Sequence, residues 1–243
     1  MDLREAGTSP NQRHPWETAR YRFFTSELAR AGVFRGGSTV LDVGSGDGWF
    51  ADGLAKDHFE RAEIVCFDVN YPEERREQQV GSSAVIKTSE LPAQKFSAVL
   101  LLDVLVHIED DIGFLSSIVQ NNLADGAQVL ISVPAWPQVW TKHDEFLKHY
   151  RRYTSAQAMD LVRRAGLKAK RSGGLFHSLL PVRGLQRLLN TTKSDRAEGA
   201  WNGGPVVTAA FAGALGLDNW MSRRLASVGV DVPGLSWWAM CEK

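Results

Sequence analysis

Cysteine is scarce in this chain, and neither sign of charge is in excess. Only Cys66 and Cys241 occur among 243 residues, so a disulfide framework and a zinc-ligand spacing are excluded, and no metal site is expected. The 28 basic residues are balanced by 28 acidic ones. This balance argues against a nucleic-acid partner, because proteins that bind nucleic acids carry a surplus of Lys and Arg. A hydrophobic content of 44% is that of an ordinary globular protein rather than a disordered one.

Long hydrophobic runs are also lacking. The longest stretch without charge, Gly199 to Leu217, is interrupted by Asn202, two glycines and Pro205, so its apolar part falls short of the ~20 residues that a transmembrane helix needs. The first ten residues have no apolar core of the kind found in signal peptides. These observations predict a cytoplasmic protein without a transmembrane segment. The oligomeric state is left open.

Short apolar runs alternate with helical stretches through the first half of the chain. The runs are continuous rather than alternating in polarity, as in strands that are covered on both faces. Expected strands are Ser38–Val43, Glu63–Val69, Ala84–Lys87, Ser97–Leu102 and Ala127–Val133. Between them lie the helical stretches Trp49–Phe59 and Ile112–Leu123, and the polar stretch Tyr71–Gln79. This rhythm predicts an α/β fold with a doubly wound, mostly parallel sheet of seven strands.

Elements at the two ends complete a single domain over residues 1–243. An amino-terminal helical flap is expected at 14–32 and a core at 38–171. Within this core, Ala135 to Thr154 is a long loop. A helix is expected from Ser155 to Ala165, because Thr154 and Gln157 form a capping box and Gly166 ends it, and a strand is expected at Leu167–Arg171. A helical insertion at 172–234 and a closing strand at 235–243 follow.

The sharpest motif is a strand that runs into a glycine turn and then a helix, Val40 to Phe50. Glycines at 44, 46 and 48 allow a tight turn and a close approach to a ligand. In the dinucleotide fingerprint G-x-G-x-x-G, the third glycine would fall at Trp49. A bulky side chain there disfavours a pyrophosphate ligand, and with it a nicotinamide-dependent oxidoreductase.

Two carboxylates accompany this turn. Asp42 precedes the glycines, and Asp68 ends the second apolar run, where a carboxylate can accept hydrogen bonds from a ribose diol. The pattern predicts a site for an adenosine-type ligand. The alternative is a plain strand-to-helix connection in which Asp68 caps a helix.

The motif resembles motif I of the class I S-adenosylmethionine-dependent methyltransferases. The segment Leu101 to Asp111 resembles the fourth-strand motif of the ubiquinone-biosynthesis-type subgroup, and Val129 to Ala135 resembles its fifth strand. Trp140 to Glu145 and His149 to Thr154 are similar to a branch of methyltransferases of type 11 and 12. The resemblance covers roughly residues 14 to 171.

This resemblance implies S-adenosylmethionine as the cofactor, with S-adenosylhomocysteine as its product. Asp42, Gly44, Ser45 and Gly46 would surround the methionine moiety, and Asp68 would hold the ribose. The adenine would lie against Val69, beside Glu90 and Leu91 of the segment after the third strand. Asp103, in the fourth-strand motif, would complete the cofactor site; Val106 replaces the Glu that this motif usually carries.

Two histidines are candidate general bases, which methyl transfer needs only when the acceptor must lose a proton. His107 follows the fourth strand, at the carboxyl edge where open α/β sheets bind ligands. His143 lies in the long loop beside Asp144, although adjacent side chains need not face each other. Either histidine could instead be structural, His107 as a helix cap and His143 as a surface residue.

The long loop carries the candidate acceptor site. Long loops of compact domains commonly bind ligands. Arg forks can bind a carboxylate or phosphate, although a solvated charged face is the alternative. The candidate substrate-binding residues are Trp136, Trp140, Tyr150, Arg151 and Arg152.

Two apolar helices, Phe176–Leu189 and Pro205–Leu217, are expected in the insertion. They are expected to roof the acceptor pocket or to pack as core. Contact with a membrane surface, suggested by Arg183 and Arg187, is the less favoured interpretation.

Together these features predict a methyltransferase that modifies an oxygen or nitrogen atom of a small polar metabolite, natural-product or sugar intermediate. The alternative is a catalytically silent protein that binds the cofactor and regulates or scaffolds a partner.

Overall fold

The computed structural model describes residues 13–181, 185 and 203–243, and one mixed sheet of eight strands forms its centre. The strand order is β3-β4-β2-β1-β5-β6-β8-β7. The five strands from β4 to β6 in this order are parallel, whereas β3 and β8 are antiparallel to their neighbours. The strands are β1 (Thr39–Val43), β2 (Glu63–Phe67), β3 (Arg76–Val80), β4 (Ser83–Thr88), β5 (Phe96–Leu102), β6 (Leu123–Pro134), β7 (Lys168–Leu175) and β8 (Ser236–Glu242).

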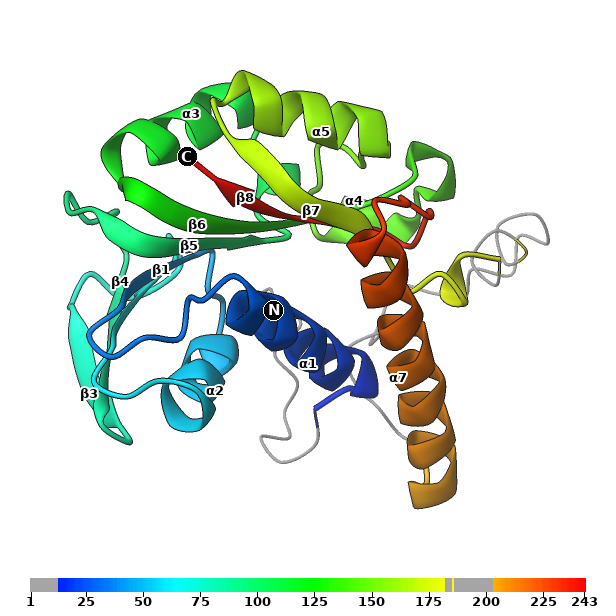
Figure 1. The fold of residues 1–243 in the computed structure, drawn as a ribbon, viewed down its shortest axis with the longest axis horizontal. Helices are drawn as coiled ribbons and strands as arrows, with labels where there is room; N and C mark the ends of the chain where they lie inside the picture. The colour runs from blue at the N-terminus through cyan, green and yellow to red at the C-terminus, as the bar shows by residue number, and fades with distance from the viewer. Residues whose placement is uncertain (1–12, 182–184, 186–202) are drawn as a thin grey trace.

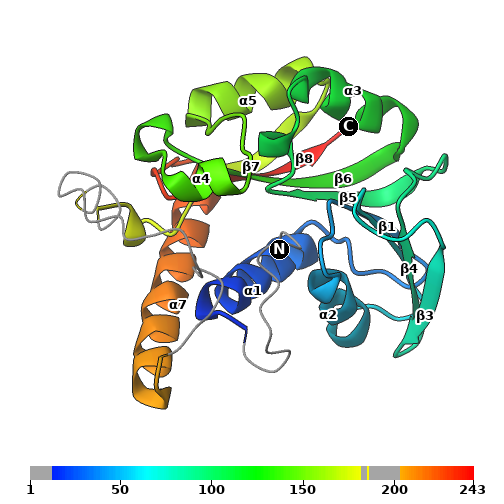
Figure 2. The same ribbon diagram turned by 180° about the vertical axis from the view of Figure 1, so that it is seen from behind.

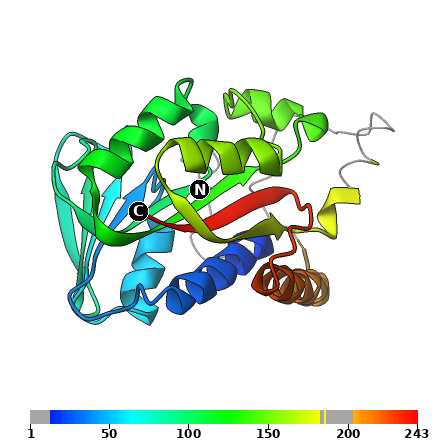
Figure 3. The same cartoon turned by 45° about the horizontal axis from the view of Figure 1, so that its top comes forward.

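Helices cover both faces of this sheet, as Figures 1 and 3 show. One face carries α1 (Pro15–Arg30), α2 (Trp49–Asp57) and α7 (Pro205–Ser227). The other carries α3 (Asp111–Asn121) and α5 (Ser155–Arg164). Shorter helical turns in the described parts of the chain include η1 (Leu105–His107), η2 (Pro137–Val139) and α4 (Lys142–Phe146). The predicted doubly wound α/β class is therefore confirmed.

The double covering explains why the parallel strands are apolar at consecutive positions. Val40 and Leu41 of β1 are both fully buried, and they belong to the two separate cores on opposite faces. The same holds for Trp237 and Trp238 of β8. The predicted closing strand is correct, and it lies between β6 and β7.

The predicted strand count of seven is too low by one. The extra strand, β3, falls in the polar stretch Tyr71–Gln79, which carried no apolar signal for a strand. It pairs with β4 through a tight turn at Gly81, at the edge of the sheet. Its side chains are almost all exposed, so backbone hydrogen bonds rather than burial hold it in place.

Helix α1 lies where the flap at 14–32 is predicted. His14 caps it in a capping box with Glu17, and Pro15 occupies its first turn. Phe23 and Phe24 are fully buried against the sheet, where each contributes roughly 1.5–3 kcal/mol of hydrophobic stabilisation. Helix α1 is thus a fixed part of the core, and its first turns reach the carboxyl edge of the sheet.

Most of the expected helix Pro205–Leu217 does not pack as core, and its alternative role as a roof over the acceptor pocket stays a prediction. Helix α7 contacts α1 and β7, yet Val206, Val207 and Leu217 are mostly exposed. The second expected helix, Phe176–Leu189, extends with Arg183 and Arg187 beyond the described residues. Across the portion of the chain that the structure describes, no helix combines the length and apolar character required to span a membrane.

Candidate functional site

Polar residues gather at the carboxyl ends of the parallel strands. The chain runs from β1 outward to β2 and β4 and then crosses to β5 on the other side of β1. Such a reversal opens a crevice between the two inner strands, and open α/β sheets bind their ligands there. Asp42, Asp68 and Asp103, all named by the sequence, lie at this edge on β1 or just after β2 and β5.

The glycine turn follows β1 and is held to the end of β2. The N–H groups of Gly44 and Ser45 both donate to the Phe67 carbonyl, at 2.7 and 3.2 Å. Gly44, Gly46 and Gly48 have φ of 64°, 58° and 82°, a left-handed conformation that favours glycine. A Cβ on Gly44 would lie 2.7 Å from Val104 Cγ2, so this glycine also lets the turn pack against the segment after β5.

Asp68 ties the second strand to the turn. Its Oδ2 accepts from the Gly46 N–H at 2.9 Å, and its Oδ1 accepts from both the N–H and the side chain of Asn70 at 2.9 Å. A carboxylate has about four lone-pair positions, so these three bonds fix its orientation and leave capacity on Oδ2.

Negative charge is crowded around the turn. Asp42 is buried, and this burial raises its pKa to about 7, with further contributions from Asp68 and Asp47. A positively charged ligand would relieve this crowding, whereas a pyrophosphate would increase it. The electrostatics therefore agree with the absence of a glycine at Trp49 in disfavouring a dinucleotide.

Three residues that the sequence analysis missed brace the turn. Lys87 of β4 donates to the Asp47 carbonyl at 2.9 Å, and the Tyr71 hydroxyl lies 3.0 Å from Ser45 Oγ. Arg13 forms an ion pair with Asp47 and lies over the Trp49 ring. The partners of these three residues lie far away in the sequence, so no local sequence pattern predicts the contacts.

The predicted adenine-side residues lie beyond β2 and β4. Val69 follows Asp68 directly, and its apolar side chain is 75% exposed. Glu90 and Leu91 follow β4 and are also exposed, with the Glu90 N–H bonded to the Thr88 hydroxyl. Exposed apolar side chains beside a carboxylate that could bind a ribose suit a flat aromatic ligand such as a nucleobase.

Asp103 takes part in a second polar group after β5. Arg20 of α1 forms an ion pair with its Oδ2 at 2.7 Å, and the Ser132 hydroxyl donates to Oδ1 at 3.0 Å. Burial opposes ionisation of Asp103, but the charge of Arg20 and the hydrogen bonds from Ser132 and Arg20 together hold its pKa below the ordinary value. Arg20 thereby joins α1 to the same edge; the sequence analysis did not identify it.

The long loop is organised around Asp144. This carboxylate has no exposed surface; it accepts from the Thr141 N–H and from Arg152 Nε, both at 2.8 Å, and it lies 2.9 Å from His149 Nδ1. Burial opposes ionisation, yet the hydrogen bonds from His149 and Arg152 hold the pKa of Asp144 well below its ordinary value. Asp144 is therefore an anion that accepts a proton-bearing Nδ1, which leaves Nε2 of a neutral His149 as an acceptor.

His149, not identified from the sequence, lies beside His107. The two ring centroids are 4.7 Å apart in an edge-to-face arrangement. The candidate His143 lies on α4, stacked near Phe146, and the neighbouring Asp144 serves His149 rather than His143. The spacing of five residues between Asp144 and His149 matches no helical face, so only the folded loop reveals the pair.

The remaining loop residues surround this group. Trp136 and Trp140 flank η2 and are partly buried, and the Tyr150 N–H donates to the Val106 carbonyl while its ring is exposed. Arg151 pairs with Asp111 at 3.0 Å, and Arg152 pairs with Asp144. Both guanidinium groups thus brace the loop, that of Arg152 from a largely buried position and that of Arg151 from a partly exposed one.

Comparisons with known proteins agree with this arrangement. A family described as a methyltransferase domain matches residues 16–172. No curated protein matches the chain. Among solved structures, the [4+2]-cyclase SpnF is similar, with 16% identity, a TM-score of 0.53, and coverage of 97% of this chain and 84% of the cyclase.

Two methyltransferases have similar structures. An S-adenosylmethionine-dependent methyltransferase from Mesorhizobium loti has 12% identity and a TM-score of 0.51, and the match covers 91% of this chain and 98% of the other. Phosphoethanolamine N-methyltransferase 2 from Haemonchus contortus, in complex with S-adenosylmethionine, has 14% identity and a TM-score of 0.52 over 98% of this chain and 54% of that one.

The family match spans well over half of the chain, so the protein belongs to the methyltransferase domain family. Its sheet has the class I architecture, and the predicted class, an S-adenosylmethionine-dependent methyltransferase, is confirmed.

The residues at the edge of the sheet fit this cofactor. Oδ2 of Asp68 retains capacity to accept a ribose hydroxyl, the exposed Val69 offers an apolar surface, and the carboxylates around Asp42 complement a cation. Nothing in this donor set requires a phosphate.

Proposed function

We propose that this methyltransferase modifies an oxygen or nitrogen atom of a small polar metabolite, such as a natural-product or sugar intermediate. The observation that supports this most directly is the pair His149–Asp144 beside His107, at the edge of the sheet where Asp103 lies. A base is useful only for an acceptor that must lose a proton, such as a hydroxyl group.

S-adenosylmethionine supplies a methyl group on a sulfonium, which is already a good leaving group. Asp68, held by Gly46 and Asn70, would accept from the ribose, and Asp42 would face the methionine ammonium. Ser45 and the left-handed Gly44 and Gly46 would shape the wall of the crevice. Fixing the reactants in one geometry is the main contribution that such a site makes.

His149 is the base that this geometry favours. Ionised Asp144 accepts from Nδ1–H and fixes the ring, so Nε2 is the nitrogen that would take the acceptor's proton. His107, whose ring lies at the edge of His149, would complete the base site from η1. His143 remains a second candidate from the same loop.

The acceptor would bind against the long loop. Trp136, Trp140 and Tyr150 would provide its apolar and aromatic surface. Arg151 and Arg152 would contribute a positive field from their positions beside Asp111 and Asp144.

Methyl transfer from labelled S-adenosylmethionine into pools of small polar metabolites tests this proposal. We expect label in hydroxyl- or amine-bearing small molecules. For a hydroxyl acceptor, His149→Asn should lower the rate by about a hundredfold or more, because general-base catalysis contributes roughly that factor. His58→Asn, at an exposed histidine after α2, is the matched control and should retain the native rate.

A comparison of turnover with cofactor binding separates a base from a structural histidine. His149→Asn should lower kcat but leave the affinity for S-adenosylmethionine nearly unchanged, because a base acts on the acceptor's proton and not on cofactor binding. Cofactor binding without transfer to any pool would contradict the proposal and favour a catalytically silent binding protein.

A further inference from the structure

Helix α7 buries polar as well as apolar side chains. Its buried residues are Leu215, Asp218, Asn219, Ser222 and Ala226. Asp218 accepts from the backbone N–H of His177 and of Ser178 at 3.1 Å, and from the Ser178 hydroxyl at 2.7 Å. The Asn219 amide donates to the Ala19 carbonyl of α1 at 2.8 Å. Hydrogen bonds therefore fix the side of α7 that faces the protein.

The outward side of α7 is apolar. Leu217, Trp220 and Met221 are 67%, 52% and 38% exposed, and their spacing of three and four residues places them on one face. Val206 and Val207 extend exposed apolar surface to the start of the helix. A helix of a globular protein normally turns its apolar stripe inward, so an outward stripe marks a binding surface.

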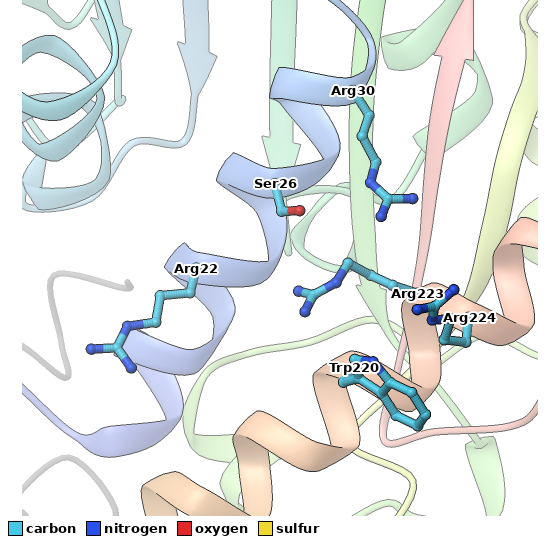
Figure 4. A pocket seen from close by; sticks show the side chains of 6 residues that line it. All are labelled: Arg22, Ser26, Arg30, Trp220, Arg223 and Arg224. Atoms are coloured by element: carbon cyan, nitrogen blue, oxygen red, sulfur yellow. The ribbon is translucent and has the colours of Figure 1, made fainter.

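A basic hollow adjoins this face, between α7 and α1 (Figure 4). Its volume is about 500 Å³. Helix α1 contributes Arg22, Ser26 and Arg30 at intervals of four residues, and Arg223 extends from α7 toward α1. Arg224 lies 5.6 Å from the Trp220 ring centroid. The described residues that line the hollow are therefore four arginines, a serine and the exposed tryptophan.

Among the described residues, those that line the hollow include four arginines and no carboxylate. Glu27 of α1 is buried, 3.3 Å from Arg171, and its charge also acts on Arg30 and Arg223, so it offsets part of the positive charge from beneath the hollow's lining. Burial lowers the pKa of Arg223, and the charges of Arg30 and Arg171 lower it further against the opposing effect of Glu27. Because the whole chain has no net charge, this is a local concentration of cations that an anion would stabilise.

We propose that α7 and the adjoining arginines of α1 form a docking surface for a membrane that contains anionic phospholipids. Leu217, Trp220 and Met221 would enter the interface between headgroups and acyl chains. Arg22, Arg30, Arg223 and Arg224 would receive the headgroup phosphates, which guanidinium forks bind well. Exposed apolar residues, a tryptophan and flanking arginines on one helix are the features of an interfacial helix.

This chemistry favours a lipid surface over other polyanions. A nucleic acid would use the arginines but leave Leu217 and Met221 in water. A small phosphate compound would likewise leave the outward face of α7 unexplained. A membrane that contains anionic lipids matches both the apolar face of α7 and the arginines of the hollow. Docking on such a membrane would not depend on methyl transfer.

Co-sedimentation of the full chain with vesicles tests the proposal. Vesicles of phosphatidylcholine alone are compared with vesicles that also contain phosphatidylglycerol. We expect binding to the anionic vesicles that weakens as salt is raised. The double variant R30Q/R224Q should bind them roughly thirtyfold more weakly, because each basic side chain near an anionic surface contributes about fivefold.

Two further variants test the apolar part of the surface and provide a control. L217S/M221S keeps every arginine but should also bind at least several-fold more weakly, because it removes the apolar part of the surface. R163Q/R164Q removes two exposed arginines of α5, on the opposite face of the sheet, and should bind like the native chain. Circular dichroism confirms that each variant is folded.

Several outcomes would overturn the proposal. These are no binding to anionic vesicles, equal binding to both vesicle types, and undiminished binding of R30Q/R224Q. Thermal stabilisation by inorganic phosphate that R30Q/R224Q abolishes, without vesicle binding, would assign the hollow to a soluble anion instead.

Discussion

The side chain of Asp144 holds the long loop in its folded conformation. It joins Thr141, His149 and Arg152, which are otherwise spread over twelve residues of irregular chain. The Asp144 side chain has no exposed surface, and that of Arg152 is only 13% exposed. The loop of the candidate acceptor site is thus held by a buried ion pair in addition to its buried apolar residues, such as Val139 and Leu147.

Replacing Asp144 by Ala should lower the free energy of unfolding by about 3–5 kcal/mol, because it leaves the Arg152 guanidinium buried without its counter-charge. Urea unfolding measures this loss. Asp160→Ala, which removes an exposed partner of Arg163, is the control and should change the value by roughly 0.5 kcal/mol or less. Equal effects of the two substitutions would contradict the role of Asp144.

Asp42 makes stability depend on pH. Burial raises its pKa from 3.8 to about 7, so the folded state holds this proton more tightly than the unfolded state. The proton bound to Asp42 therefore stabilises the folded state fully below pH 4, and this stabilisation is lost as the pH rises to about 7. Over that window the native chain should lose up to about 4 kcal/mol relative to Asp42→Asn.

Unfolding free energies of the native chain and of Asp42→Asn, measured in parallel at acidic and neutral pH, check this sign. Subtracting one from the other removes the effect of the titrating groups that do not interact with Asp42. Parallel pH profiles for the two proteins would show that Asp42 does not carry the raised pKa.

At the scale of the element, the glycine turn depends on close packing as well as on backbone conformation. Gly44 and Gly37 have similar left-handed φ angles, of 64° and 78°. A Cβ on Gly44 would meet Val104, whereas one on Gly37 would meet nothing within 4 Å. Comparing alanine substitutions at these two positions therefore separates the energetic cost of backbone strain from that of overpacking.

Gly37→Ala should cost roughly 1–2 kcal/mol, the strain of a left-handed residue with a Cβ. Gly44→Ala should cost roughly 1–3 kcal/mol more, because the turn or Val104 must move. Chemical denaturation of both variants measures the difference. If both variants lose the same stability, the turn does not pack tightly on the segment after β5.

The parallel strands could be predicted from the sequence because burial on both faces leaves continuous apolar runs. The glycine turn, Asp68 and the capping box of Thr154 with Gln157 are local signals of the same kind, and the structure places each of these elements as expected. Strand β3 gave no such signal, since backbone pairing alone defines it.

Other features could not be predicted because they depend on contacts between distant segments. Arg20 meets Asp103 only after α1 has packed across the sheet. His149 meets Asp144 only when the loop has closed. The composition of α7 indicated an apolar helix, but the orientation of its apolar side is set by the hydrogen bonds of Asp218 and Asn219.

At the scale of the molecule, the sheet brings together groups that lie far apart in the chain. Figure 2 shows the sheet from behind, with α1 beside the strands on which these groups are carried. Asp42, Asp68 and Asp103 come from three neighbouring strands around the reversal of strand order, and Arg20 reaches Asp103 from α1. We propose that this edge holds the sulfonium nucleoside through Asp68.

Isothermal titration with S-adenosylmethionine tests that claim directly. We predict micromolar binding by the native chain and by Asp160→Ala. Binding should be about tenfold to a hundredfold weaker in Asp68→Ala, since hydrogen bonds to a charged group contribute roughly 1.5–3 kcal/mol. Absence of binding by the native chain, or native affinity in Asp68→Ala, would contradict the account.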